Sequence, residues 1–127
     1  MMSANALCGR RILVVEDQYA IALDLAETLA QEGATTVGPL CSLKDALNAL
    51  ETAGPLDAAV LDIRLLGESV YPVADRLDEL HVPYIFTTGC EPDEIPERYR
   101  FVPRFDKPVR VTSIVEALRG QLTSVRS

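Results

Sequence analysis

The sequence predicts an α/β fold in which helices cover both faces of a parallel five-stranded sheet. The main observation is an apolar run over residues 58–61 that ends at Asp62 and has the length of a strand. A run without polar alternation is typical of a strand buried on both faces of a parallel sheet. Three further strand-like runs also end in polar residues, and helical segments separate the runs. Strands that alternate with helices favour a parallel sheet with right-handed crossovers.

The first half of the chain divides into five expected elements. A strand is predicted over residues 11–16, and a helix follows over 20–30, where Ile21, Leu25 and Leu29 have helical spacing before Gly33. A short second strand over 35–37 is expected to end at the Gly-Pro pair 38–39. Ser42 is a suitable N-cap for a helix over 43–50, because its hydroxyl can accept a hydrogen bond from a free backbone N–H. The central strand to Asp62 comes next.

The second half shows the same alternation with a weaker fourth helix. We expect a loop over residues 64–71, a helix that begins at Pro72, and a fourth strand over 84–87. Pro92 and Pro96 leave room for little more than one helical turn before the next strand. That fifth strand is predicted over residues 101–105, and a last helix runs from 110 to about 122.

This element order predicts a flavodoxin-like, doubly wound sheet with strand order 2-1-3-4-5 and a short or eroded fourth helix. Strands one and three are neighbours in that order, so Asp17 and Asp62 should lie side by side at the carboxyl edge. We expect a flexible lead-in over residues 1–9, one folded domain over 10–123, and a tail over 124–127.

The composition of the 127 residues excludes several classes of protein. The chain has 12 basic and 19 acidic residues and a net charge of −7, which argues against direct nucleic-acid binding. Apolar runs are too short for membrane insertion, and the start of the chain has no secretory signal. The 3 cysteines lie far apart and fit neither a zinc motif nor a disulfide framework. These features predict a cytoplasmic protein with free thiols.

Polar residues at the strand ends predict the chemistry of the carboxyl edge. Glu16, Asp17 and Asp62 would repel one another if left without a cation, and Mg²⁺ prefers such carboxylates together with phosphate oxygens. An aspartate oxygen in such a site can attack a phosphoryl group. Lys107 is the candidate cation beside that group, and a hydroxyl from Thr88 or Thr87 is the candidate donor.

These residues resemble the receiver domains of response regulators, the phosphoacceptor half of two-component signalling. The similar motifs are Leu13-Val14-Val15-Glu16-Asp17, Val60-Leu61-Asp62, Phe86-Thr87-Thr88-Gly89 and Asp106-Lys107-Pro108, so the resemblance covers nearly the whole chain. It implies that Asp62 is phosphorylated and that Lys107 forms a salt bridge with the phosphoryl group. It also implies that Thr88 is the switch hydroxyl and that the bond between Lys107 and Pro108 is cis.

The same resemblance implies the magnesium ligands. Asp17 and Asp62 would bind the ion, Glu16 would assist through a water molecule, and the main-chain carbonyl of Arg64 would be a further ligand.

A narrower resemblance links residues 83–89 and 95–99 to bacterial single-domain receivers with the motif P-F-x-F-A-T-G-G/Y, whose fourth helix is eroded. This chain departs from that motif at Tyr84, Thr87 and Cys90. It also carries Arg104 where many receivers have a switch aromatic residue.

The sequence therefore predicts a stand-alone phosphoacceptor receiver rather than an enzyme acting on other substrates. A histidine kinase or phosphotransfer protein would donate the phosphoryl group to Asp62 in a Mg²⁺-dependent reaction, and the output would be contact with a downstream protein or a phosphorelay. The alternative is a receiver-fold interaction module regulated independently of phosphorylation. A hydrolase would need a further acid or base in the site, and the sequence supplies none.

Overall fold

A computed structural model describes residues 6–89 and 94–125 of the chain. The first elements in chain order are β1 (Arg11–Val15), α1 (Tyr19–Gln31), β2 (Thr35–Leu40), α2 (Leu43–Thr52) and β3 (Ala58–Asp62). The remaining elements are β4 (Arg64–Leu65), β5 (Glu68–Ser69), α3 (Tyr71–Glu79), β6 (Tyr84–Thr88), the 3₁₀ helix η2 (Glu97–Tyr99), β7 (Arg104–Asp106) and α4 (Val111–Val125).

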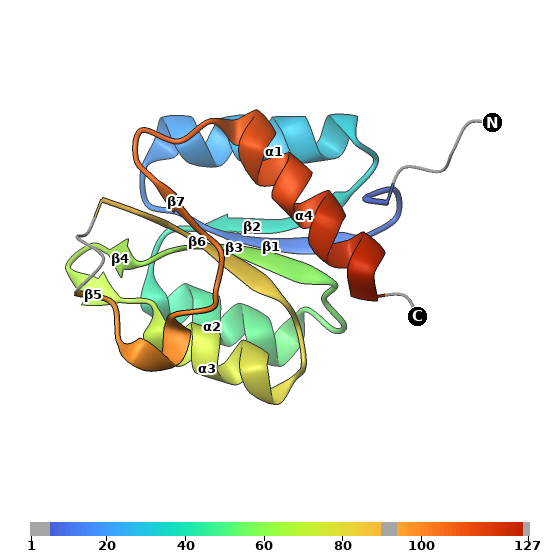
Figure 1. The fold of residues 1–127 in the computed structure, drawn as a ribbon. Coiled ribbons are helices and arrows are strands. Elements are labelled where there is room, and N and C mark those ends of the chain that lie inside the picture. The colour runs from blue at the N-terminus through green and yellow to red at the C-terminus, as the bar shows by residue number, and fades with distance from the viewer. Residues whose placement is uncertain (1–5, 90–93, 126–127) are drawn as a thin grey trace.

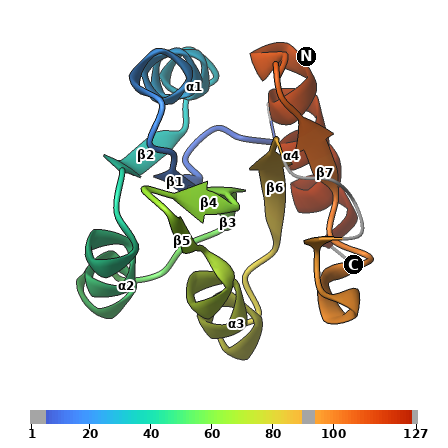
Figure 2. The ribbon, with the colours of Figure 1, turned by 90° about the vertical axis from the view of Figure 1, so that its left-hand side faces the viewer.

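Five parallel strands form the central sheet in the order β2-β1-β3-β6-β7, while β4 and β5 form a separate antiparallel pair. Helices α1 and α4 cover one face of the sheet, and α2 and α3 cover the other (Figure 1). A view from the carboxyl ends of the strands shows this strand order from side to side (Figure 2). The predicted flavodoxin-like order is confirmed, with β6 and β7 as the fourth and fifth strands of the sheet.

Two apolar cores lie on the two faces of the sheet. Along β1, Leu13 and Val15 pack into the core beneath α2 and α3, whereas Ile12 and Val14 pack into the core beneath α1 and α4. Successive side chains of a strand point to opposite faces, so a strand that contributes to both cores must be apolar throughout. This requirement explains why the unbroken apolar runs identified the inner strands.

Strand β2 continues past the Gly-Pro pair at which the sequence predicted its end. It runs to Leu40 through a cis peptide bond between Gly38 and Pro39, and its register against β1 shifts between Leu13 and Val15. Proline cannot donate to a strand ladder and is therefore confined to edge strands and bulges. The prediction of a shorter strand was wrong because β2 lies at the edge of the sheet, where this proline is tolerated.

The segment after Asp62 is a hairpin and not the loop that was predicted. Arg64 pairs with Ser69 and Leu65 with Glu68, and the turn between these short strands contains Leu66 and Gly67 at φ angles of 52° and 87°. Positive φ at both central residues is typical of a tight hairpin turn. The pairing holds the hairpin over the carboxyl end of β3 (Figure 2).

Other boundaries differ by a few residues from those predicted. Strand β6 reaches Thr88, and β7 begins only at Arg104, because Phe101 is 92% exposed and lies outside the sheet. Helix α4 begins at Val111 and continues to Val125. Leu7, which precedes the predicted start of the domain at residue 10, is fully buried in the core beneath α1 and α4. Ser42 caps α2 as expected and accepts a hydrogen bond from Asp45 N at 3.1 Å.

In the described residues, η2 occupies the place of the predicted short fourth helix, and aromatic contacts attach it to α3 and β6. The Tyr99 ring stacks on Tyr71 with centroids 4.6 Å apart and meets Phe86 edge-on at 5.7 Å. Its hydroxyl donates to Asp75 Oδ1 at 2.5 Å, and Arg98 pairs with Asp75 Oδ2 at 3.2 Å. The predicted roles of Cys90 and Pro92 lie outside the described residues.

No helix within the described parts of the chain is both long and apolar enough to span a bilayer.

Candidate functional site

Polar side chains from several strand ends line one open cavity at the carboxyl edge of the sheet. The cavity has a volume of about 490 Å³. Its buried and ion-paired polar groups lie near the end of β3. In a doubly wound sheet, a ligand site is expected at this edge. The described residues that line the cavity are Asp17, Gln18, Asp62, Arg64, Thr88, Gly89, Glu94 and Lys107.

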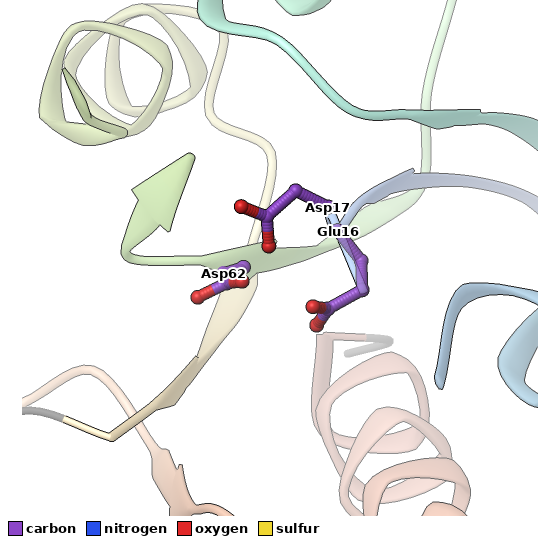
Figure 3. A group of neighbouring side chains, drawn as sticks. All are labelled: Glu16, Asp17 and Asp62. Carbon is purple, nitrogen blue, oxygen red and sulfur yellow. The ribbon is translucent and has the colours of Figure 1, made fainter. Parts of the chain in front are cut away.

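Three carboxylates from β1 and β3 converge at this edge. Glu16, Asp17 and Asp62 each offer an oxygen within 4.8 Å of those of the other two (Figure 3). The neighbouring strands β1 and β3 are in register with Val15 opposite Leu61, which places the acidic pair beside Asp62. Glu16 is 2% exposed and Asp62 is 4% exposed, so two of these acids are almost removed from solvent. The predicted juxtaposition of Asp17 and Asp62 is confirmed.

Lys107 partly neutralises the acidic group from the end of β7. Its Nζ donates to Glu16 Oε2 and to Asp62 Oδ2, both at 3.0 Å. Burial lowers the pKa of Lys107, but hydrogen bonds and attraction from Glu16 and Asp62 outweigh that effect and leave the pKa raised. Lys107 is therefore charged at neutral pH. The peptide bond from Lys107 to Pro108 is cis, as the resemblance implied.

Asp62 has an unusually basic carboxylate. The pKa of Asp62 is raised to about 8, first by burial and then by the adjacent Glu16, while the hydrogen bond from Lys107 opposes the rise. Since one ammonium faces two buried carboxylates, the site retains an excess of negative charge when Asp62 is ionised. Such a site favours a further cation.

The two candidate threonines occupy different positions. Thr87 is fully buried, lies opposite Asp62 in the β3–β6 register, and donates from Oγ1 to Glu16 Oε1 at 3.3 Å. Thr88 is also buried but lines the cavity with Asp62, and its carbonyl accepts a hydrogen bond from Lys107 N at 2.8 Å. Thr88 therefore has the placement expected of the cavity hydroxyl, while Thr87 supports Glu16.

The hairpin contributes main-chain donors to the acidic group. Arg64 N donates to Asp62 Oδ1 at 3.3 Å, and Leu66 N donates to Asp17 Oδ2 at 3.0 Å. These bonds require the backbone of the segment after Asp62 to turn back over the site. The role of the Arg64 carbonyl as a metal ligand stays a prediction.

Gln18 is a site residue that the sequence analysis did not identify. Its side-chain oxygen accepts a hydrogen bond from Lys107 Nζ, and its main-chain N–H donates to Glu16 Oε2 at 3.1 Å. The sequence did offer one indication of this role. Gln18 directly follows the acidic pair and stands at the N-cap of α1, where glutamine is not a preferred residue.

The residues present fit a magnesium ion. Mg²⁺ takes oxygen ligands at about 2.1 Å, so two oxygens on one ion lie about 3–4 Å apart. Glu16, Asp17 and Asp62 each offer an oxygen within 4.8 Å of those of the other two, so one ion could be held among them directly or through a bound water. The cavity is open enough to leave room for waters and a phosphate group.

Comparisons with known proteins place this geometry among response regulators. No protein-family model matches the chain. It is similar to SdrG from Sphingomonas melonis Fr1, with 36% identity over 96% of this chain and 99% of that one, at a TM-score of 0.76. The BeF3-activated conformation of SdrG gives 35% identity over 95% of this chain and 99% of that one, at a TM-score of 0.71.

Two further relatives are longer proteins. The response regulator PhyR from Brucella abortus is 27% identical over 91% of this chain and 48% of its own, with a TM-score of 0.74. The transcriptional regulatory protein PdtaR from Mycobacterium tuberculosis is 26% identical over 97% of this chain. The chain spans 62% of the length of PdtaR.

Proposed function

Because this chain belongs to the receiver domains of two-component response regulators, we propose that it accepts a phosphoryl group on Asp62 from a histidine kinase or phosphotransfer protein in a Mg²⁺-dependent reaction. One observation carries the proposal. A nearly buried aspartate at the carboxyl edge faces a lysine ammonium at 3.0 Å, and two further carboxylates lie beside it.

Asp17 and Asp62 would bind the ion, Glu16 would assist through a water molecule, and the Arg64 carbonyl would be a further ligand. The bound ion would supply positive charge against the phosphoryl oxygens during transfer.

The residues of the chain position and stabilise the transferred group. An Asp62 oxygen forms the new bond to phosphorus while the bond from phosphorus to the donor breaks, and the leaving group keeps that electron pair. Lys107 and the Arg64 N–H already donate to the two Asp62 oxygens, and both lie near the charge that the phosphoryl group brings. Thr88 is placed to donate from the wall of the cavity. These donors favour the phosphorylated state because they are in position before transfer.

Signal output would pass to a downstream protein or along a phosphorelay. Phosphorylation adds about two negative charges at neutral pH and biases an existing equilibrium between conformations. SdrG, to which this chain is similar, has also been solved in a BeF3-activated conformation.

Intact-protein mass spectrometry with acetyl phosphate tests the proposal. Wild type should gain one phosphoryl adduct only when Mg²⁺ is present, and Asp62→Asn should gain none. Asp45→Asn, an exposed aspartate on α2, is the matched control and should label as wild type does.

A folded, Mg²⁺-binding protein that gains no adduct from acetyl phosphate or from candidate kinases would contradict the proposal. That result would favour an interaction module regulated without phosphorylation.

A further inference from the structure

The Lys107 ammonium makes three hydrogen bonds, which is its full donor capacity. Two go to the carboxylates of Glu16 and Asp62, and the third goes to the side-chain oxygen of Gln18. The first two acceptors lie in the floor of the site, whereas Gln18 is exposed and lies on its open side. Gln18 is therefore the solvent-side anchor of the ammonium.

The main chain at Gln18 is fixed, so its side chain is presented from a defined point. Its carbonyl accepts the hydrogen bond from Ala22 N at 3.0 Å that begins α1, and its N–H donates to Glu16 Oε2. The side chain makes no capping hydrogen bond with the helix. At an N-cap, serine, threonine, aspartate or asparagine would stabilise the helix by about 1 kcal/mol more than a residue that does not cap.

A residue that breaks a local preference while contacting a functional group indicates a role in the site. We propose that Gln18 is a positioning residue that holds the Lys107 ammonium beside Asp62 and thereby sets the rate of phosphoryl transfer. The rate effect rests on the proposed phosphorylation of Asp62, whereas the contact itself does not.

Positioning matters here because lysine has a flexible side chain with many rotamers. Once an Asp62 oxygen is bonded to phosphorus, it becomes a weaker acceptor, and the N–H that it held turns to a phosphoryl oxygen. Glu16 and Gln18 then keep the ammonium in place through its two remaining hydrogen bonds. Without the Gln18 oxygen, that third N–H faces water, and the ammonium is less well ordered when the donor arrives.

The variant Gln18→Met tests this role. Methionine has a similar length but lacks the acceptor oxygen, and the main-chain bonds of residue 18 remain. We expect labelling by acetyl phosphate at fixed Mg²⁺ to slow about fivefold, the change that corresponds to one hydrogen bond of ordinary strength. Gln31→Met makes the same chemical change on the exposed end of α1 and should leave the rate unaltered.

A double-mutant cycle separates positioning from general structure. In a Lys107→Ala background, Gln18→Met should have no further effect on the labelling rate. An equal slowing in both backgrounds, or no slowing in the wild-type background, would overturn the proposal.

A second cycle reads the same contact without phosphorylation. Urea unfolding midpoints are measured for the two single variants and the double variant, with no phosphodonor present. Gln18→Met should lower the midpoint less in the Lys107→Ala background than in the wild-type background. Equal shifts in the two backgrounds would overturn the proposal about Gln18, even if no variant is phosphorylated. If no variant is phosphorylated but the shifts differ, only the proposed phosphorylation of Asp62 is contradicted.

Discussion

Asp62 and Asp75 are hydrogen-bonded aspartates of the same molecule whose environments act in opposite directions. Asp62 is 4% exposed beside Glu16, and its pKa is raised to about 8 because burial and like charge disfavour ionisation. The side chain of Asp75 is 48% exposed, and its pKa is lowered, first by the Tyr99 hydroxyl and then by Arg98.

Under the proposed function, the difference separates a carboxylate that accepts a phosphoryl group from one that stabilises the fold. Ionised Asp62 opposes folding in the absence of a further cation, whereas ionised Asp75 holds η2 against α3. Asp62 shares the Lys107 ammonium with Glu16, so its charge is only partly compensated, whereas Asp75 faces Arg98.

Removal of the Tyr99 ring should cause the largest loss of stability. Tyr99 is 2% exposed and stacks on Tyr71, so Tyr99→Ala should lower the free energy of unfolding by about 3 kcal/mol. Urea denaturation measures the change. Phe101→Ala is the matched control, and it should change stability by less than about 0.5 kcal/mol because Phe101 is 92% exposed. Equal losses would show that η2 is not attached through Tyr99.

Neutralisation of Asp62 should stabilise the Mg²⁺-free protein at high pH. We expect Asp62→Asn to raise the free energy of unfolding by about 2 kcal/mol at pH above 8, less than the full pKa shift would give, because solvent in the open cavity screens the charge. The folded pKa of about 8 lies above the ordinary 3.8, so wild type loses stability as the pH rises through this window. The gain should therefore disappear toward pH 4. A gain that did not vary with pH would contradict this account.

Mg²⁺ should offset the loss of stability that ionised Asp62 causes. At a free concentration ten times its dissociation constant, the ion should raise the free energy of unfolding of wild type by about 1.4 kcal/mol. Its binding should tighten as the pH rises toward 8, because Asp62 ionises over that range. Thermal unfolding with and without the ion measures the effect. Asp62→Asn should show a smaller shift, because the variant has lost one of the three carboxylates, and an equal shift would place the ion elsewhere.

Removal of the Asp75 charge should have a smaller effect with the opposite pH dependence. Asp75→Asn should lower the free energy of unfolding by about 1 kcal/mol at neutral pH, because the bond from the Tyr99 hydroxyl loses its charged acceptor. The pKa of Asp75 is depressed, so its contribution is present above the ordinary pKa of 3.8 and is lost as the pH falls through the folded pKa. Wild type and variant should converge in acid. A difference that grew in acid would contradict the assignment.

The main features of the fold and site could be predicted because they depend on local patterns. Apolar runs marked the strands that contribute to both cores, and their polar ends identified Asp62 and Lys107 although 45 positions separate them. Once the strand order is known, parallel strands bring such ends to one edge. Elements at the edge of the fold were harder to predict. Strand β2 continues through Pro39, a residue that usually ends a strand, and the two-residue strands of the hairpin are too short to show an alternation of polar and apolar residues.

The sequence alone determined that Asp17, Asp62 and Lys107 meet at the carboxyl edge, because burial of both sheet faces requires apolar strands whose order follows from the alternation of elements. Tertiary structure alone decided the division of roles within the site. The resemblance already favoured Thr88 as the switch hydroxyl, but only the folded structure shows that the adjacent Thr87, whose side chain points to the opposite face, donates to Glu16. The partner of Gln18 is 89 positions away, and a hydrogen bond across that separation forms only when the folded sheet brings β1 and β7 to a common cavity.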